Sequence, residues 1–203
     1  MNSGPRAAQP WGARVLLAVG TLVLAAAPAA WARVYATQQE ALARLLPPPA
    51  TIERHIAYLT EEQARRVEEL SGESLQGHVV PYYVGRVEEK VIGYAFTDSH
   101  LVRTLPESVL FALDDAGRIR STEILSFDEP SEYLPSPRWL KQFEQQALDD
   151  RLSLKQDIRT LTGATISSRV VTEAARRVLA LFQVIIREGE SGSAPAPVGE
   201  GSR

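Results

Sequence analysis

The clearest hydrophobic pattern in the chain lies near its C-terminal end, between residues 166 and 186. Apolar side chains recur there every three or four positions, at Val170, Val171, Ala174, Val178, Leu181, Phe182 and Ile185. The opposite side carries mostly charged residues, namely Arg169, Glu173, Arg176 and Arg177. This spacing is typical of an amphipathic helix, so we predict a long helix over Ile166–Ile186 with one buried face.

The middle of the chain has the composition of β-strands. Segments rich in β-branched and aromatic residues span Val79–Val87, Val91–Thr97, Val109–Leu113 and Ile119–Phe127. The last two segments flank Asp114-Asp115-Ala116-Gly117, which is a strong hairpin signal. We therefore predict an α+β fold in which helices pack on an antiparallel sheet.

Further helices are predicted on either side of these strands. A short helix over Thr37–Leu46 ends at three prolines, and a helix over Thr60–Leu70 begins with a capping-box spacing of Thr60 and Gln63. Ser136-Pro137 opens another helix that we expect to run from Arg138 to about Leu148. The predicted organisation is a helical connecting segment at 37–76, a domain at 77–188 and a disordered tail at 189–203.

The first 36 residues have the layout of a secretory signal or a membrane anchor. Arg6 and Arg14 precede an apolar run from Val15 to Ala30, and Ala30-Trp31-Ala32 offers a small-x-small cleavage site. With the residues up to Tyr35, the apolar stretch approaches the length of a spanning helix. Because the positive charge lies on the N-terminal side, we expect the bulk of the chain on the periplasmic or other extracytoplasmic face of the membrane.

Charge and composition exclude several classes of function. The net charge is −3 without a basic stripe, so we expect no nucleic-acid partner. The absence of cysteine excludes an iron–sulfur cluster, a thiol pair and Cys-attached haem. The three histidines, including His100 in an expected solvated loop, are not spaced for a metal site. A redox role would therefore need an organic cofactor.

The candidate chemistry lies just before the long helix, in Leu161-Thr162-Gly163-Ala164-Thr165-Ile166-Ser167-Ser168. Gly163 permits a tight turn and close approach of a ligand, and Ala164 adds little bulk. Hydroxyl groups at Thr165, Ser167 and Ser168 surround a helix start, where unpaired N–H groups and the helix dipole favour a phosphate. An alternative interpretation is that Thr162, Thr165 or Ser168 only caps the helix.

The same segment resembles the flavinylation motif of the FMN-binding domain family, which includes extracytoplasmic subunits of Rnf-type complexes and of the sodium-pumping NADH:quinone oxidoreductase. The resemblance extends over about Gly77–Ile186. It implies that Thr165 bears FMN through a phosphoester, within a site that includes Thr162, Gly163, Ala164, Ser167 and Ser168. It also implies that a separate, magnesium-dependent flavin transferase donates the FMN from FAD.

One position departs from that motif. The family has an acidic residue three positions before the first threonine, and this chain has Arg159 there, with Asp157 two residues further back. Two modes of binding therefore remain open, covalent FMN on Thr165 and FMN held without a covalent bond.

A second segment, Phe127-Asp128-Glu129-Pro130-Ser131-Glu132-Tyr133-Leu134, resembles the Glu-Pro loop that lies near the flavin ring in that family. The resemblance implies that Glu129 accepts a hydrogen bond from the cofactor and that Tyr133 stacks on or edges the ring. An ordinary surface turn is the competing interpretation. Trp139, in the following helix, is expected in the core.

Two functions follow from these interpretations. The first is an electron-transfer flavoprotein that carries FMN and exchanges electrons with a membrane redox partner, acting as a carrier or subunit rather than a stand-alone enzyme. The second is an exported, non-redox module that binds a ligand or protein and uses the Thr-Gly-Ala-Thr segment only as a helix cap.

Overall fold

The protein is described by a computed structural model that covers Met1 and residues 33–189. The predicted signal or anchor segment falls outside the described residues up to residue 32, and so does the predicted tail from residue 190. Within residues 33–189, no helix has the length and apolar character needed to cross a membrane.

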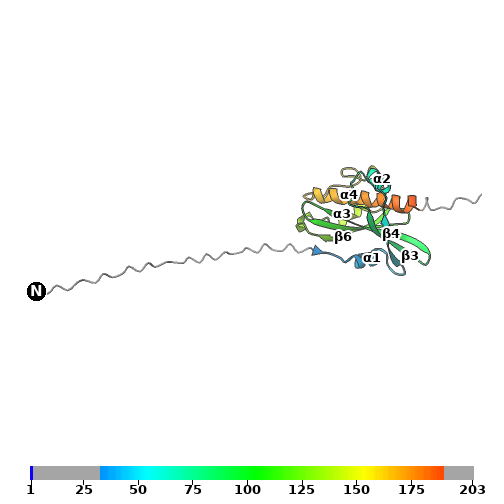
Figure 1. Ribbon diagram of the computed structural model, residues 1–203, viewed down its shortest axis with the longest axis horizontal. Helices are drawn as coiled ribbons and strands as arrows, with labels where there is room; N and C mark the ends of the chain where they lie inside the picture. Colours follow the sequence, from blue (N-terminus) through cyan, green and yellow to red (C-terminus); the bar gives the residue numbers. More distant parts are fainter. Residues whose placement is uncertain (2–32, 190–203) are drawn as a thin grey trace, which may run out of the picture. The chain divides into compact units, whose positions relative to one another are not determined.

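A six-stranded antiparallel sheet forms the centre of the fold, in the order β1-β6-β5-β4-β3-β2 (Figure 1). Its strands are β1 (Arg33–Val34), β2 (Thr51–Tyr58), β3 (Val79–Val87), β4 (Lys90–Leu101), β5 (Pro106–Leu113) and β6 (Ile119–Phe127). Every neighbouring pair is antiparallel. The predicted α+β class is confirmed, and β3 and β6 have the predicted bounds.

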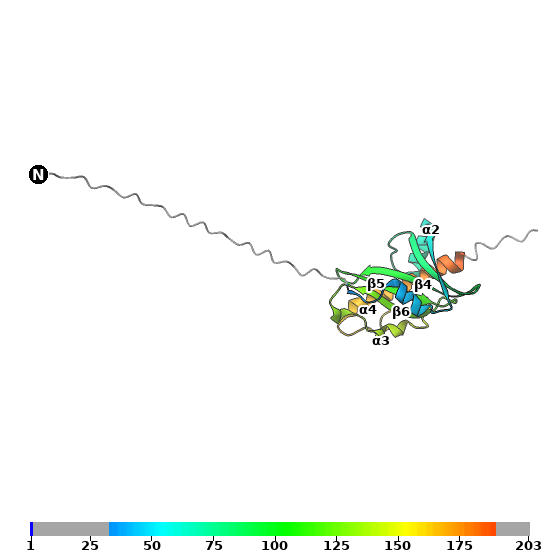
Figure 2. The same ribbon diagram turned by 90° about the horizontal axis from the view of Figure 1, so that it is seen from below.

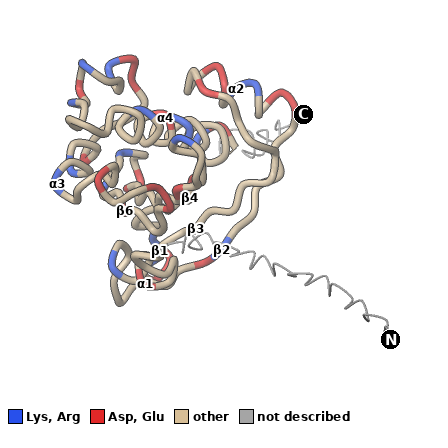
Figure 3. Tube along the Cα trace, turned by 90° about the vertical axis from the view of Figure 1, so that its left-hand side faces the viewer, with Lys and Arg blue, Asp and Glu red and all other residues tan. Residues whose placement is uncertain are grey.

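Helices cover the two faces of the sheet (Figures 2 and 3). The long helix α4 (Thr165–Phe182) continues into a π-helical segment, η3 (Gln183–Glu188), and packs with α2 (Glu61–Ser71) on one face. The short helix α1 (Gln38–Leu45) lies on the opposite face, where it covers Ala95, Leu110 and Leu125. The main core therefore lies between α4 and the sheet.

Local signals in the sequence explain where these elements end. The N–H of Gln63 donates to Thr60 at 3.2 Å and the Gln63 side chain accepts from the Thr60 N–H at 3.0 Å, so the capping box of α2 is confirmed. Gly117 adopts a φ of +80° in the β5–β6 hairpin, and a Cβ there would collide with the ring of Phe182. This hairpin turn is therefore restricted to glycine both by conformation and by packing.

Strand β2 was not predicted, because residues 37–76 were expected to form a helical connecting segment, with helices only at Thr37–Leu46 and Thr60–Leu70. All of β2 is exposed or half-buried, and its exposure alternates only weakly. It pairs along its whole length with β3 as the edge strand of the sheet. Backbone pairing rather than a buried apolar face holds this strand, so the sequence carries little signal for it.

The helix predicted from Arg138 to about Leu148 is wrong beyond its first turns. Ser136 caps α3 (Pro137–Leu140) as predicted, but a 3-10 turn, η2 (Lys141–Phe143), ends the helical segment. The chain then leaves the helix to hydrogen-bond with the start of β6: the N–H of Gln145 donates to the Ile119 carbonyl at 2.7 Å, and the N–H of Ile119 donates to the Gln146 carbonyl at 2.9 Å. Tertiary backbone pairing thus overrides local helix propensity here.

His100 is buried in the sheet rather than solvated in a loop, which corrects the expectation from the sequence. Its Nδ1 lies 2.8 Å from Asp98 and its Nε2 lies 3.1 Å from Glu107. Arg177 of α4 donates two hydrogen bonds to the Asp98 carboxylate, at 2.9 and 2.8 Å. These four side chains, which we call the Asp98 network, join α4 to β4 and β5.

The Asp98 network gives stability a defined pH dependence. Burial lowers the pKa of His100, but hydrogen bonds to Asp98 and Glu107 outweigh it and raise that pKa from 6.5 to about 9. Burial raises the pKa of Asp98, but its bonds to His100 and Arg177 outweigh it and lower that pKa from 3.8 to about 2. The contribution of His100 is thus complete below pH 6.5 and is lost as pH rises through 9, whereas that of Asp98 is complete above pH 3.8 and is lost toward pH 2.

His100 and Asp98 together therefore stabilise the fold most between pH 3.8 and pH 6.5. Burial raises the pKa of Glu107, so this carboxyl adds a further fall in stability as pH rises above 4.5. Unfolding by denaturant is measured at a series of pH values from 5 to 9.5. The denaturant concentration at the midpoint should fall as pH rises above 6.5. In a His100→Gln variant, this fall should be much weaker. A wild-type midpoint that stays constant or rises between pH 7 and pH 9.5 would contradict the geometry of the network.

Candidate functional site

The segment before α4 is fixed by one buried serine. The Ser168 hydroxyl accepts from the N–H of Leu161 at 2.8 Å and donates to the Ala164 carbonyl at 3.0 Å. Gly163 adopts a φ of +83°, which confirms the predicted tight turn. Ser168 therefore ties the two ends of the turn together, and its hydroxyl is already used within the protein.

No side chain caps the N-terminus of α4. The residue at the cap position is Ala164, and none of the neighbouring hydroxyl groups accepts from the first N–H groups of the helix. The interpretation of Thr162, Thr165 or Ser168 as a simple helix cap is therefore wrong. The positive end of an 18-residue helix is left to interact with an anion.

The predicted site residues of this segment divide into two groups. Thr162, Gly163 and Thr165 are exposed, whereas Ala164, Ser167 and Ser168 are buried. Thr165 is the first residue of α4, so its hydroxyl lies beside the free end of the helix. A Cβ built on Gly163 would meet nothing within 4 Å, so the turn leaves open space for a ligand.

The segment that precedes this turn is anchored to α3. The Trp139 indole N–H donates to the Arg159 carbonyl at 2.6 Å, and the Arg159 N–H donates to the Gln142 side chain at 2.9 Å. Asp157 pairs with Arg151 at 2.9 Å. The backbone at position 159 is thus held in place, while the Arg159 side chain is exposed.

Glu129 and Tyr133 meet around Arg103. One carboxylate oxygen of Glu129 accepts the N–H groups of Arg103, Thr104 and Leu105 at 3.2, 2.9 and 3.1 Å. These bonds, that of Thr104 foremost, lower the pKa of Glu129. The Arg103 guanidinium lies over the Tyr133 ring, 4.1 Å from its centroid. Glu129 therefore shapes the turn between β4 and β5, a role that the sequence did not reveal.

The direction of α4 places its start at the same end of the sheet as this turn. Phe182 packs edge-on against Tyr94, and Arg177 bonds to Asp98, so α4 runs antiparallel to β4. The N-terminal end of α4 therefore lies toward the C-terminal end of β4. From Arg177 back to Thr165 the helix covers roughly 18 Å. From Asp98 to the end of β4 at Leu101 the strand covers roughly 10 Å. The start of α4 thus reaches the end that also holds the β4–β5 turn and the Glu129 loop (Figure 1).

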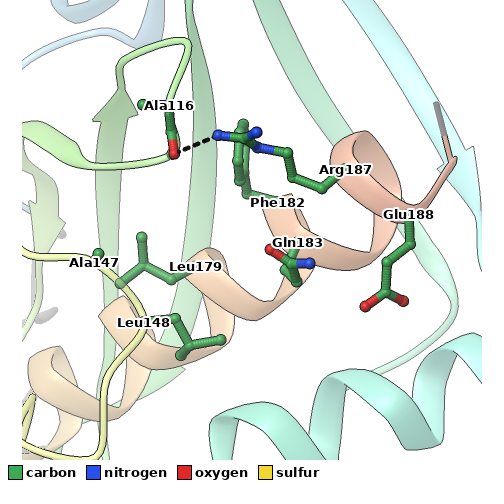
Figure 4. A pocket seen from close by; sticks show the side chains of 9 residues that line it. Ala116, Ala147, Leu148, Leu179, Phe182, Gln183, Arg187 and Glu188 are labelled. Atoms are coloured by element: carbon green, nitrogen blue, oxygen red, sulfur yellow. Dashed lines mark hydrogen bonds between the residues drawn. The ribbon is translucent and has the colours of Figure 1, made fainter. Parts of the chain in front are cut away.

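Two cavities have a volume of about 540 Å³, one at the C-terminal end of α4 and one beside the segment that precedes α4. The first is lined by the hairpin residues Ala116 and Gly117 and by the C-terminal part of α4 and η3, where Arg187 donates to the Ala116 carbonyl at 2.9 Å (Figure 4). The helix dipole is negative at that end and disfavours a phosphate. The second lies between α3 and the segment before α4, and Leu161 forms part of its wall.

The fold and this site define a class of protein, an α+β domain that offers a threonine hydroxyl and an uncapped helix start to a phosphate-bearing ligand. Residues 106–180 match the model of the FMN-binding domain family. This match indicates FMN as the cofactor. No curated protein matches the chain.

The residues present fit the phosphate of FMN. An exposed hydroxyl, unpaired helix N–H groups and open space at Gly163 occur together at one point. The matched region contains this segment, the Glu129 loop and α3. Among the described residues no cluster of side chains suited to a metal ion is found.

The hydrogen bonds of Ser168 lead to a testable effect on cofactor loading. Ser168→Ala leaves the half-buried N–H of Leu161 without its acceptor, which costs about 1–3 kcal/mol. We expect the turn to loosen and FMN incorporation to fall severalfold, as measured by the flavin-to-protein ratio. Thr172→Ala is the matched control, because it removes another buried hydroxyl that bonds only within α4. Equal loading in both variants would contradict the positioning role of Ser168.

Proposed function

We propose that this protein is an extracytoplasmic electron-transfer flavoprotein whose FMN is esterified through its phosphate to Thr165. The observation that carries the proposal is the uncapped start of α4 at an exposed threonine, inside a region that matches the FMN-binding domain family. A cap would have explained these hydroxyl groups without a ligand, but the structure shows none.

In this proposal the protein acts on the phosphate through its own helix. The N–H groups at the start of α4 and the helix dipole stabilise the negative phosphate oxygens. The hydroxyl oxygen of Thr165 forms the new ester bond to the FMN phosphorus, and the pyrophosphate bond of FAD breaks. AMP leaves, and the hydroxyl proton passes to water. A separate, magnesium-dependent flavin transferase supplies the FAD and catalyses this exchange.

When bound, FMN supplies the capacity to accept and release electrons, and the protein positions it. The covalent bond keeps the cofactor from diffusing away outside the cytoplasm. The apolar run of residues 15–30 supports export or anchoring, since it follows Arg6 and Arg14. The partner we propose is a membrane redox protein that exchanges electrons with the flavin.

Arg159 makes the mode of attachment a separate question from flavin binding. The backbone at this position is fixed by Trp139 and Gln142, so the exposed Arg159 side chain belongs to an ordered segment. Asp157 does not replace the missing acidic group freely, because it pairs with Arg151. Recognition by the transferase must therefore tolerate a guanidinium at this position.

The test is expression of the full chain in an export-competent host that contains a flavin transferase. We expect intact mass to rise by one FMN less one water, and flavin fluorescence to persist in a denaturing gel. A yellow protein that releases its flavin on denaturation would show non-covalent binding and overturn the ester alone. A colourless protein of unchanged mass would overturn the proposal.

A further inference from the structure

Exposed apolar side chains gather at one end of the sheet. They are Val34 of β1, Ile56 and Tyr58 of β2, Val79 of β3 and Leu101 of β4, with exposed fractions of 67, 41, 74, 60 and 59%. In the described part of the chain, the other large apolar side chains with such exposure are Met1 and Tyr35, and Tyr35 follows Val34. Single exposed apolar side chains are common, but a group of them at one place marks a contact surface.

The pairing of the strands places these side chains on one face. Successive side chains of a strand alternate between faces, and side chains directly opposite each other in antiparallel strands share a face. Tyr58 is opposite Val79. Val34 is joined to the strand of Leu101 by a row of three serines, Ser126 of β6, Ser108 of β5 and Ser99 of β4, each opposite the next. The row carries no charge, although 23% of the chain is charged.

Helix α1 covers the same face farther along the strands. Ala95 of β4 packs in the small core beneath α1, and Leu101, six positions later, shares its face. Tyr83 of β3 packs against that core, and Val79, four positions earlier, shares its face. The five apolar residues and the three serines are thus the part of this face that α1 leaves uncovered, and we call them the exposed strip.

The exposed strip lies where the chain enters the sheet. β1 begins at Arg33, three residues after the apolar run of residues 15–30. Fully extended, the four residues from Ala30 to Val34 span at most roughly 14 Å. A membrane anchor formed by this run therefore holds Val34 close to the bilayer, and the rest of the strip follows from Val34 across the sheet.

We propose that the exposed strip contacts the surface of the bilayer in which the apolar run is anchored. Aliphatic side chains enter the boundary between headgroups and acyl chains, and tyrosine rings favour this interface. Two exposed arginines flank the strip, Arg54 on the same face of β2 and Arg103 in the turn after Leu101. Their charges favour anionic headgroups. The inference goes beyond the proposed function, because it requires no flavin.

This contact fixes the orientation of the domain toward the membrane. The start of α4 lies at the same end of the sheet as Leu101, the last residue of β4. The exposed strip therefore keeps Thr165 near the bilayer, which is where the redox partner of the proposed function lies. An anchor alone would leave the domain free to turn on its tether.

The test uses single fluorescent labels, which the chain allows because it contains no cysteine. The full chain with Leu101→Cys, labelled with a nitrobenzoxadiazole dye, is reconstituted into vesicles of phosphatidylcholine and phosphatidylglycerol. We expect a blue-shifted emission, and quenching by nitroxide-bearing lipids at least threefold stronger than in Arg65→Cys. This matched control labels an exposed position of α2, which packs with α4 on the opposite face of the sheet.

A second measurement separates contact through the strip from mere closeness to the anchor. In the Leu101→Cys protein, the added changes Tyr58→Ser and Val79→Ser remove apolar surface from the far side of the strip. Both residues are exposed, so the melting temperature should stay unchanged. Lipid quenching of the label should fall at least twofold.

Each contrary result is distinct from a failure of the proposed function. Equal quenching at positions 101 and 65, or a chain that does not remain with the vesicles, overturns the bilayer contact. A label at position 101 that is shielded from water but not quenched by lipid shows that a second copy covers the strip, and also overturns it. The gain of FMN mass on Thr165 is measured separately and does not depend on these outcomes.

Discussion

Thr165→Ala is expected to abolish covalent FMN completely. The variant removes the exposed hydroxyl at the first residue of α4, so no hydroxyl oxygen remains at that position to form the ester. Folding should be unaffected, because Thr165 is exposed and makes no cap. The measurement is in-gel flavin fluorescence together with intact mass, after co-expression with the flavin transferase.

Thr162→Ala is the matched control for this result. Thr162 is also an exposed threonine of the same turn, three residues earlier, and it lies outside α4. We expect it to retain the covalent label. If Thr162→Ala lost the label and Thr165→Ala retained it, the ester would form on Thr162, and the assignment to Thr165 would be wrong.

Asp98→Ala is expected to destabilise the fold by about 3–5 kcal/mol, the usual cost of removing one partner from a buried ionic network. The variant leaves Arg177 and His100 without the carboxylate that both contact, between α4 and the sheet. The measurement is the free energy of unfolding in denaturant. At roughly 2–4 °C per kcal/mol, the melting temperature should also fall by about 10 °C.

Glu173→Ala serves as the control for this second effect. Glu173 also pairs with an arginine of α4, Arg169 at 3.0 Å, but this pair lies on the surface. Its loss should cost no more than about 0.5 kcal/mol. A loss of similar size in both variants would show that the Asp98 network does not hold α4 on the sheet. Because α4 carries Thr165 at its start, a displaced helix should also lower FMN incorporation in Asp98→Ala.

The elements with a strong periodic or turn signal were predicted well from the sequence. The long helix, the strands of the central sheet and the Asp114–Gly117 hairpin follow from apolar spacing and turn chemistry, which act locally. The edge strand β2 and the early end of α3 were missed, because backbone pairing with β3 and with Ile119 determines them. Such pairing depends on residues far away in the chain.

The same division applies to the candidate site. Thr165 and Gly163 were predicted from the motif, and the structure places them at an exposed helix start. The sequence did not predict that Ser168 bonds within the protein or that Glu129 holds the turn at Arg103. A hydroxyl or carboxylate in a sequence does not show which partner it contacts. The buried state of His100 was missed for the same reason, since Glu107 contacts it from β5, and its other partner, Asp98, is held by Arg177 of α4.

The most direct measurement of the central claim is peptide mapping of the loaded protein. Trypsin cleaves after Arg159 and Arg169, which releases Thr160–Arg169 as a peptide that contains the whole turn. Tandem mass spectrometry should find FMN on this peptide, joined through phosphate to Thr165. The same peptide recovered only without modification, or with FMN on another residue, would contradict the account.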